Sequence, residues 1–277
     1  MTIQDALYYG EQILEDAGVP DAKHDAWFLL ADLLQMDRSA YYLRGQEEIT
    51  PEQKEDYRIL VKKRAERIPL QYILGAQEFM GIPIKVNSNV LIPRQDTEVL
   101  VSEAAKLLRP QESVLDMCTG SGCILLALLS MVPDLQGTGV DISKQALLVA
   151  KENATENALS ATWICSNLFE KVDGTFDMIV SNPPYIPTEE ISTLMPEVQE
   201  FEPVSALDGG LDGLDFYRIL AEQAPRYLCP GGYFLCEIGY NQAEDVSDLL
   251  AIQGFIHIQV IQDLAGKDRV VRGQLPA

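Results

Sequence analysis

The sequence predicts an α/β fold in which a small helical domain precedes a larger domain built on a mostly parallel sheet. Three patterns support this. Helical periodicity with capping signals covers residues 1–75, apolar residues alternate with a period of two near residues 79–92, and strand and helix patterns alternate after Pro93. The chain has 277 residues, of which 47% are hydrophobic, so it can bury a sizeable core as one or two domains.

The N-terminal region contains three helix signals. Thr2-x-x-Asp5 is typical of a capping box and precedes an amphipathic run that ends near Gly18. A second run covers 21–36, and Thr50-Pro51-x-Gln53 opens a third that extends to about Arg67. The last of these contains Lys62-Lys63-Arg64, for which a solvated helix face is the simpler interpretation and a partner-binding face the alternative.

A β-hairpin is expected next. Apolar residues alternate over 82–86, Asn87-Ser88-Asn89 offers a turn, and Val90-Leu91-Ile92 continues the apolar pattern. The expected domain boundaries are 1–75 for the helical domain, 76–92 for the hairpin linker and 93–277 for the sheet domain.

Seven strands are predicted in the third region, and helical runs separate the first five. This alternation favours parallel strands joined by crossover helices. The last two candidates are joined by the short connection 263–268, which favours an antiparallel edge. The candidates are Ser113–Met117, Thr138–Val140, Trp163–Cys165, Phe176–Val180, Tyr233–Glu237, Phe255–Ile261 and Arg269–Arg272.

Composition excludes several classes of function. The net charge of −21 gives none of the surplus of Lys and Arg from which nucleic-acid binding draws its affinity. The longest apolar stretch, 123–132, is shorter than the ~20 residues that span a bilayer, and the N-terminus lacks a signal-like segment, so we expect a cytoplasmic protein without membrane contact. Two histidines and five cysteines without a CxxC pair predict no metal site.

A glycine-containing loop follows the first strand of the sheet domain. It reads Asp116-Met117-Cys118-Thr119-Gly120-Ser121-Gly122, and Asp141 follows at the end of the next strand. Small residues let the backbone approach a ligand, and an acidic side chain at the second strand end can bind ribose hydroxyls, so a nucleoside-containing cofactor is favoured over a simple tight turn. The Asp116 carboxylate would repel a pyrophosphate and suit a cationic sulfonium, which favours S-adenosylmethionine over a dinucleotide.

The fourth predicted strand is followed by Asn182-Pro183-Pro184-Tyr185. Alone, this tetrapeptide would be read as a turn. At the end of such a strand it offers the Asn182 side-chain oxygen and the Pro183 carbonyl as two acceptors for a planar NH₂ group. They would orient the nitrogen and draw off positive charge as a methyl group arrives, while the Tyr185 ring offers a flat face.

Together these motifs resemble those of class I S-adenosylmethionine-dependent methyltransferases. The tetrapeptide is similar to that of enzymes that methylate planar nitrogens, including adenine-N6 and cytosine-N4 methyltransferases and the HemK/PrmC family, which methylates the glutamine of release factors. Only the similarity to HemK/PrmC covers nearly the whole chain. It includes the segments 69–75, 78–81, 91–98 and 202–207.

The HemK/PrmC resemblance implies a seven-stranded Rossmann-like methyltransferase sheet, with the helical domain docking the substrate. It implies methylation of N5 of the glutamine in the Gly-Gly-Gln motif of peptide-chain release factors. We expect a monomer. The implied catalytic residues are Asn182, Pro183 and Tyr185. The implied cofactor-binding residues are Asp116, Cys118, Thr119, Gly120, Ser121, Gly122, Asp141, Ile142, Asn167, Leu168 and Asn182, and those for the substrate are Asn182, Pro183, Pro184, Tyr185, Phe79 and Arg94.

Two positions depart from the family pattern. Cys118 stands where the family usually has Gly, which narrows the room near the methionine part of the cofactor. Asn167 stands where an Asp is usual and must present its carbonyl to the adenine amino group, with Leu168 and Phe169 as apolar neighbours of the ring.

Two other functions compete with this one. Amino methylation of adenine or cytosine in nucleic acid would require a basic groove and usually a target-reading insertion, and neither is visible. A non-enzymatic module of the translation apparatus is disfavoured because Asp116, Asp141 and Asn182 are all present.

Overall fold

The computed structural model describes residues 1–277, and its contacts divide the chain into two units. The first, here the helical unit, comprises Met1–Gly75 together with Met195–Phe201. The second, the sheet unit, comprises Ala76–Leu194 and Glu202–Ala277. A short stretch from the middle of the sheet domain's sequence therefore belongs to the helical unit, which the sequence patterns did not indicate.

The helical unit begins with a helix at the predicted capping box. Thr2 and Asp5 cap α1, and Thr50 and Gln53 cap α4, each pair through two reciprocal hydrogen bonds. Tyr57 is buried and donates a hydrogen bond to the Ala26 carbonyl oxygen at 3.0 Å. The helices are α1 (Ile3–Asp16), α2 (Ala22–Leu34), α3 (Arg38–Arg44), α4 (Pro51–Ala65) and α5 (Leu70–Leu74), to which the later α9 (Pro196–Phe201) is added.

A buried cluster of charges lies inside the helical unit. The Arg64 guanidinium donates to Asp25 at 2.6 Å and to Glu197 at 2.8 Å, and Arg67 donates to Glu197 at 2.7 and 2.8 Å. The interpretation of Lys62-Lys63-Arg64 as a solvated face therefore holds for the two exposed lysines and is wrong for Arg64, which is 5% exposed. Buried charges of this kind are tolerated because they are paired and hydrogen-bonded.

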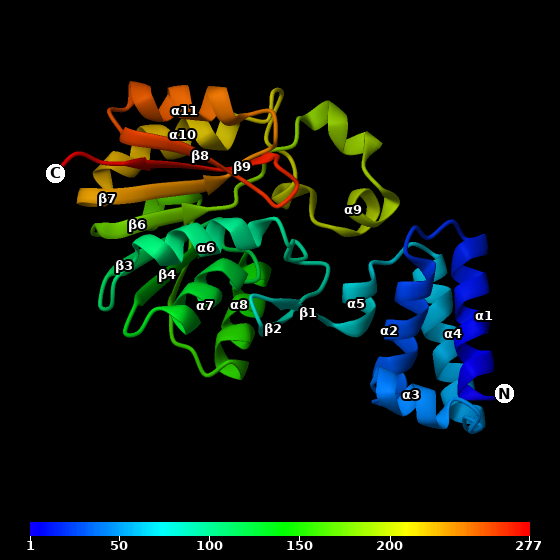
Figure 1. Cartoon of the computed structure of the whole chain (residues 1–277). Coiled ribbons are helices and arrows are strands. Elements are labelled where there is room, and N and C mark those ends of the chain that lie inside the picture. Colours follow the sequence, from blue (N-terminus) through cyan, green and yellow to red (C-terminus); the bar gives the residue numbers. More distant parts are fainter. The chain divides into compact units, whose positions relative to one another are not determined.

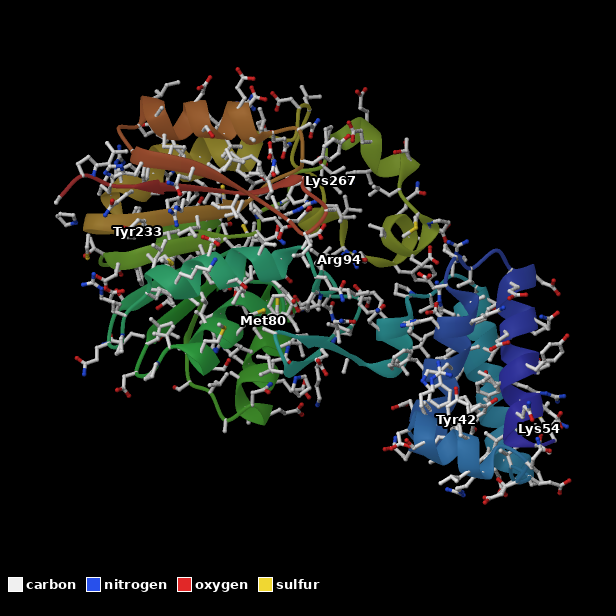
Figure 2. All side chains as sticks on the ribbon, viewed as in Figure 1. Tyr42, Lys54, Met80, Arg94, Tyr233 and Lys267 are labelled. Atoms are coloured by element: carbon white, nitrogen blue, oxygen red, sulfur yellow. The ribbon has the colours of Figure 1, made fainter.

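The hairpin forms, but its turn lies earlier than predicted. Strands β1 (Ala76–Phe79) and β2 (Ile82–Lys85) pair antiparallel through Met80 and Gly81, whose φ angles of 50° and 78° are typical of a two-residue turn. Figure 2 labels Met80 at this turn. The chain does turn at 87–89, where the Val90 N–H donates to the Asn87 carbonyl oxygen at 3.1 Å, but the predicted returning strand at 90–92 is wrong, because residues 86–92 form no strand.

The seven predicted strands form one sheet in the order β5-β4-β3-β6-β7-β9-β8. The first five strands along the chain run parallel. Strand β9 pairs antiparallel with β8, as the short connection indicated, and also antiparallel with β7. The bounds are β3 (Ser113–Met117), β4 (Gln136–Asp141), β5 (Thr162–Cys165), β6 (Phe176–Ser181), β7 (Leu228–Glu237), β8 (Ile256–Gln262) and β9 (Asp268–Gln274).

Helices cover both faces of this sheet (Figure 1). On one face lie α6 (Thr97–Leu107), α7 (Cys123–Met131) and α8 (Lys144–Glu156), and on the other α10 (Asp215–Gln223) and α11 (Ala243–Ile252). Between β5 and β6 the chain makes only a 3₁₀ turn, Leu168–Lys171, rather than a helix. The other 3₁₀ turns are Thr188–Thr193, Val204–Ala206 and Ala224–Arg226.

The strand order reverses between β3 and β6. Chain segments leave this point towards opposite faces, which opens a crevice at the carboxyl ends of the strands. None of the helices combines the length and the apolar character that crossing a bilayer requires.

Candidate active site

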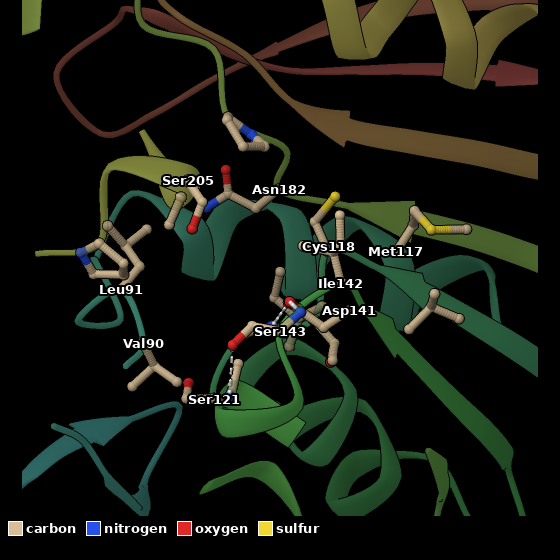
Figure 3. A pocket seen from close by; sticks show the side chains of 18 of the residues that line it. Val90, Leu91, Met117, Cys118, Ser121, Asp141, Ile142, Ser143, Asn182 and Ser205 are labelled. Carbon is tan, nitrogen blue, oxygen red and sulfur yellow. Dashed lines mark hydrogen bonds between the residues drawn. The ribbon is translucent and has the colours of Figure 1, made fainter. Parts of the chain in front are cut away.

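A cavity of about 500 Å³ lies in the sheet unit at the carboxyl ends of the parallel strands. Its wall is formed by residues that directly follow β3, β4, β5 and β6, and is completed by segments 89–97 and 203–208. Figure 3 shows Cys118, Asp141, Ser143 and Asn182 around this cavity. The volume lies within the ~300–1,000 Å³ range of pockets that enclose a small ligand.

The loop after β3 approaches the cavity through its backbone. Cys118, Gly120 and Gly122 have φ angles of 62°, 54° and 80°, which a glycine adopts without strain. A Cβ atom on Gly122 would also stand 2.9 Å from the Trp163 ring, so this position has no room for a side chain. Cys118, Thr119, Gly120 and Ser121 line the cavity, whereas Gly122 lies behind it and starts α7.

Asp141, at the end of β4, lines the cavity as predicted. Its Oδ2 atom accepts the Gly120 N–H at 2.9 Å and its Oδ1 atom accepts the Ser143 N–H at 2.8 Å. Burial raises the pKa of Asp141, and the backbone hydrogen bonds from Ser143 and Gly120 oppose that rise. The carboxylate thus fixes the two neighbouring loops and has further lone pairs that can accept from hydroxyl groups. Ile142 lines the cavity beside it and is largely exposed.

Asp116 does not line the cavity, so the expected direct contact with a sulfonium group is not present. Its side chain is wholly buried under the loop, where Oδ2 accepts the Thr119 hydroxyl at 2.5 Å and Oδ1 has no hydrogen-bond partner. Burial raises the pKa of Asp116 to about 7. Asp116 can therefore influence a ligand only indirectly, by orienting the Thr119 side chain and through the electrostatic potential of its carboxylate.

The residues after β5 give the cavity an acceptor and an apolar wall. The Asn167 Nδ2 atom donates to Glu170 at 2.9 Å, which leaves the Asn167 carbonyl oxygen to accept from an adenine amino group. Leu168 lines the cavity, but Phe169 is buried in the core and stacks on Tyr227 with ring centroids 4.6 Å apart. The expectation that Phe169 contacts the adenine ring is therefore wrong.

Asn182 lines the cavity at the end of β6, and its orientation is defined. The Nδ2 atom donates to the Thr97 hydroxyl at 3.3 Å. Pro184 also lines the cavity, whereas Pro183 is buried beside it. The Tyr185 ring packs on the core and its hydroxyl donates to Glu237 at 3.2 Å, so Tyr185 does not present its face to the cavity as expected.

The two other predicted substrate residues differ in position. Arg94 lines the cavity and forms an ion pair with Glu202, whose second carboxylate oxygen accepts the Ile92 N–H at 3.4 Å. Burial raises the pKa of Glu202, and the Arg94 charge opposes that rise. Phe79 is 1% exposed in β1 and lies outside the cavity wall, which contradicts its assignment as a direct contact.

Sequence reasoning missed several residues of the wall, although most lie in segments it had noted. Thr97 lies in the 91–98 segment and Pro203 and Ala206 in the 202–207 segment. Ser143, Ser166 and Phe216 had no local signal, because each is an ordinary residue that the fold brings to the crevice. No group of His, Cys, Asp and Glu side chains is arranged to hold a metal ion.

Comparison with known families accounts for most of the chain. Residues 5–75 match the PrmC N-terminal domain family and residues 94–198 match the methyltransferase small domain family. A methyltransferase structure from Pyrococcus furiosus, 18% identical, shares the fold with a TM-score of 0.56 and covers 80% of this chain and 98% of that one.

Curated relatives match over nearly the full length. A release factor glutamine methyltransferase of Geobacter sulfurreducens is 45% identical over 275 residues, which is 99% of this chain and 97% of the relative. The protein of the same name in Agrobacterium fabrum is 40% identical over 278 residues, covering 98% and 96%.

The cavity fits the methyl donor that this fold uses, S-adenosylmethionine. Asp141 offers acceptors for a ribose, and Asn167 offers one for the adenine amino group. The glycine loop lines the same cavity with small residues, so its backbone can approach a ligand closely. Identity and coverage of this extent show that the chain belongs to the release factor glutamine methyltransferase family.

Proposed function

We propose that the chain transfers the methyl group of S-adenosylmethionine to the side-chain amide nitrogen of the glutamine in the Gly-Gly-Gln motif of peptide-chain release factors. The observation that carries this proposal is the position of Asn182. Its amide lines the cavity while its nitrogen is held by Thr97, so its oxygen is the atom available to a substrate NH₂ group. The names of the full-length relatives support the substrate class.

Two acceptors hold the glutamine amide in this mechanism. The Asn182 oxygen accepts one N–H, and the main-chain carbonyl of Pro183, which lies beyond the end of β6 and outside its ladder, accepts the other. An amide nitrogen is a poor nucleophile because its lone pair is delocalised into the carbonyl. Acceptors on both N–H groups fix its direction of attack and stabilise the positive charge that develops on it.

The cofactor supplies an electrophilic methyl group on its sulfonium. Cavity-lining residues of the chain would hold it in place: Asp141 at the ribose, Asn167 and Leu168 at the adenine, and the loop 118–121 along the methionine part. Since the methylated amide nitrogen is acidic in its cationic form, solvent water can take its proton, and no side-chain base is required. Proline rigidity at 183–184 keeps the acceptors in position.

Methyl transfer to protein and to nucleic acid can be compared directly. The enzyme with labelled S-adenosylmethionine should methylate an intact release factor, and replacing the Gly-Gly-Gln glutamine by alanine should abolish incorporation. Duplex DNA and RNA should stay unlabelled, because the −21 net charge opposes approach of a phosphate backbone. Labelled adenine or cytosine with an unlabelled release factor would refute the proposal. The cytoplasm, where release factors act, is the proposed location, and a monomer the proposed state.

The helical unit, with boundaries near 1–75, is proposed to dock the release factor. Helix α3 contains no buried residue, and Tyr42 and Leu43 on it are 80% and 86% exposed. Tyr42→Ser with Leu43→Ser should raise the KM for intact release factor and leave the KM for a short Gly-Gly-Gln peptide unchanged. Equal KM values for intact factor in variant and wild type would contradict docking through α3.

A further inference from the structure

Thr97 and Glu237 form a connected group of side chains beneath Asn182. Thr97, at the start of α6, and Glu237, at the end of β7, are each 2% exposed. The Thr97 hydroxyl accepts from Asn182 Nδ2 at 3.3 Å. Thr97 is also close enough to the Glu237 carboxylate to lower its pKa, and the Glu237 Oε2 atom is buried without a hydrogen-bond partner.

Which group donates in each of these hydrogen bonds follows from the single hydrogen that the Thr97 hydroxyl carries. A threonine hydroxyl has one hydrogen to donate. A buried carboxylate oxygen without a partner is costly, so the hydroxyl hydrogen turns towards Glu237. The hydroxyl oxygen can then only accept from Asn182, which requires the nitrogen of the Asn182 amide on that side and places its oxygen on the cavity side.

We propose that Glu237 is a positioning residue that, through the Thr97 hydroxyl, holds the Asn182 amide with its oxygen towards the substrate nitrogen. The proposal rests on the role of Asn182 given above. Glu237 acts through other residues, since it does not line the cavity. It also holds the tetrapeptide at a second point, because its Oε1 atom accepts the Tyr185 hydroxyl at 3.2 Å.

The direction reverses when Glu237 gains a proton. A protonated Glu237 can donate to Thr97, which releases the Thr97 hydrogen from Glu237 and lets the hydroxyl donate to the amide. The Asn182 amide can then turn its oxygen inwards and its nitrogen to the cavity, an orientation that the ionised carboxylate opposes. In that orientation the N–H of the Asn182 amide faces the N–H of the substrate glutamine, and two donors cannot form a hydrogen bond. Burial raises the pKa of Glu237 to about 6, so this reversal falls in an accessible pH range.

Charged and titratable groups from every neighbouring element surround Glu237. Thr97 and Asp96 belong to the start of α6, and Tyr185 follows β6. Arg269 of β9 favours the charged carboxylate but already donates to Asp263 at 3.1 Å. Tyr217 of α10 donates to the Glu237 main-chain oxygen at 2.8 Å, and Cys236 precedes it in β7. Among these, Thr97 is the residue that also accepts a hydrogen bond from Asn182.

Glu237→Gln tests the proposal, because its amide can donate to Thr97 as the protonated acid does. The wild-type kcat should fall as the pH is lowered through about 6. Glu237→Gln should lower kcat by about 10- to 100-fold, less than the ~10²–10³-fold typical of deleting a polar group at the reacting atoms. Its pH profile should lack the acidic limb, while the Kd for S-adenosylmethionine and the KM for release factor stay unchanged.

Two Thr97 variants test the same connection without changing Glu237. Thr97→Val removes the hydroxyl at nearly constant volume and should lower kcat and remove the acidic limb. Thr97→Ser retains the hydroxyl and should restore both. A Thr97→Val enzyme with wild-type kcat and the same acidic limb would overturn the proposal, whether or not Glu237→Gln folds.

Asp177→Asn is the matched control for exchanging a carboxylate for an amide in this sheet. Asp177 lies at the opposite end of β6 and accepts the Ser113 N–H and hydroxyl, both at 2.8 Å. This variant should lose stability but keep kcat and its acidic limb. If Asn182→Ala abolishes transfer while Glu237→Gln behaves as wild type, only the positioning role fails; if Asn182→Ala stays active, the proposed function of Asn182 itself fails.

Discussion

Replacing Asp141 by alanine should separate cofactor binding from folding. The Asp141 carboxylate accepts two backbone N–H groups, from Gly120 at 2.9 Å and Ser143 at 2.8 Å, and faces the cavity with its other lone pairs. Losing a hydrogen bond from a ribose hydroxyl to a charged acceptor costs about 1.5–3 kcal/mol. At 1.4 kcal/mol per tenfold change, the Kd for S-adenosylmethionine should rise about 10- to 150-fold.

The same substitution also loosens the fold, so it needs a control with equal structural cost. Each lost backbone hydrogen bond contributes ~1 kcal/mol to the free energy of unfolding. Asp177→Ala removes a carboxylate that also accepts two hydrogen bonds in this sheet, from the Ser113 N–H and the Ser113 hydroxyl, both at 2.8 Å. Asp177 lies near the start of β6, at the opposite end of the strand from Asn182, and does not line the cavity. Both variants should lose similar stability, but only Asp141→Ala should lose affinity.

Isothermal titration with S-adenosylmethionine at pH 7 measures the affinity, and thermal unfolding of the same samples measures the stability. An unchanged Kd for a folded Asp141→Ala protein would refute the assignment of Asp141 to the ribose. An equal loss of affinity in Asp177→Ala would show that the effect comes from destabilisation alone.

Three further substitutions test separate parts of the structure. Burial raises the pKa of Glu197, but hydrogen bonds from Arg67 and Arg64 outweigh it and lower that pKa to about 2, so the stability that Glu197 contributes should be lost as the pH falls from about 4.5 to 2. In chemical unfolding, Glu197→Gln should lower the free energy of unfolding by about 3 kcal/mol at pH 7 and make it less dependent on pH in that range. Cys118→Gly should raise Tm by a few degrees because it relieves the positive φ, whereas Cys118→Ala should not. Asn167→Asp should weaken cofactor binding about two- to fivefold in titration, since a carboxylate would replace the donor to Glu170; tighter binding would contradict this.

Local sequence signals predicted most of the fold. Both capping boxes start helices at the expected residues, and each predicted strand of the sheet forms. These signals succeed because N-caps and buried strands are specified by neighbouring residues. The hairpin turn was misplaced because Asn87-Ser88-Asn89 carries stronger turn residues than Met80-Gly81, although only the latter pair has the positive φ angles.

The candidate site could be predicted only in part, because side-chain direction depends on distant residues. Asp141 and Asn182 lie on the cavity wall, since Asp141 is the last residue of β4 and Asn182 directly follows β6, both at the carboxyl ends of the strands. Asp116 and Tyr185 come from the same motifs but turn inwards, towards Thr119 and Glu237. The pairing of Arg64 with Glu197, 133 positions apart, likewise has no local signal.

The Asn182→Ala variant tests the central claim most directly, with methyl transfer and cofactor affinity measured on the same protein. Mass spectrometry of the release factor after single turnover reports methylation of the Gly-Gly-Gln glutamine, and titration reports the Kd for S-adenosylmethionine. The account predicts that transfer falls by at least about 10²-fold while the cofactor still binds, because the lost oxygen orients the substrate nitrogen. Methylation of that glutamine at a rate near wild type, with cofactor bound, would contradict it.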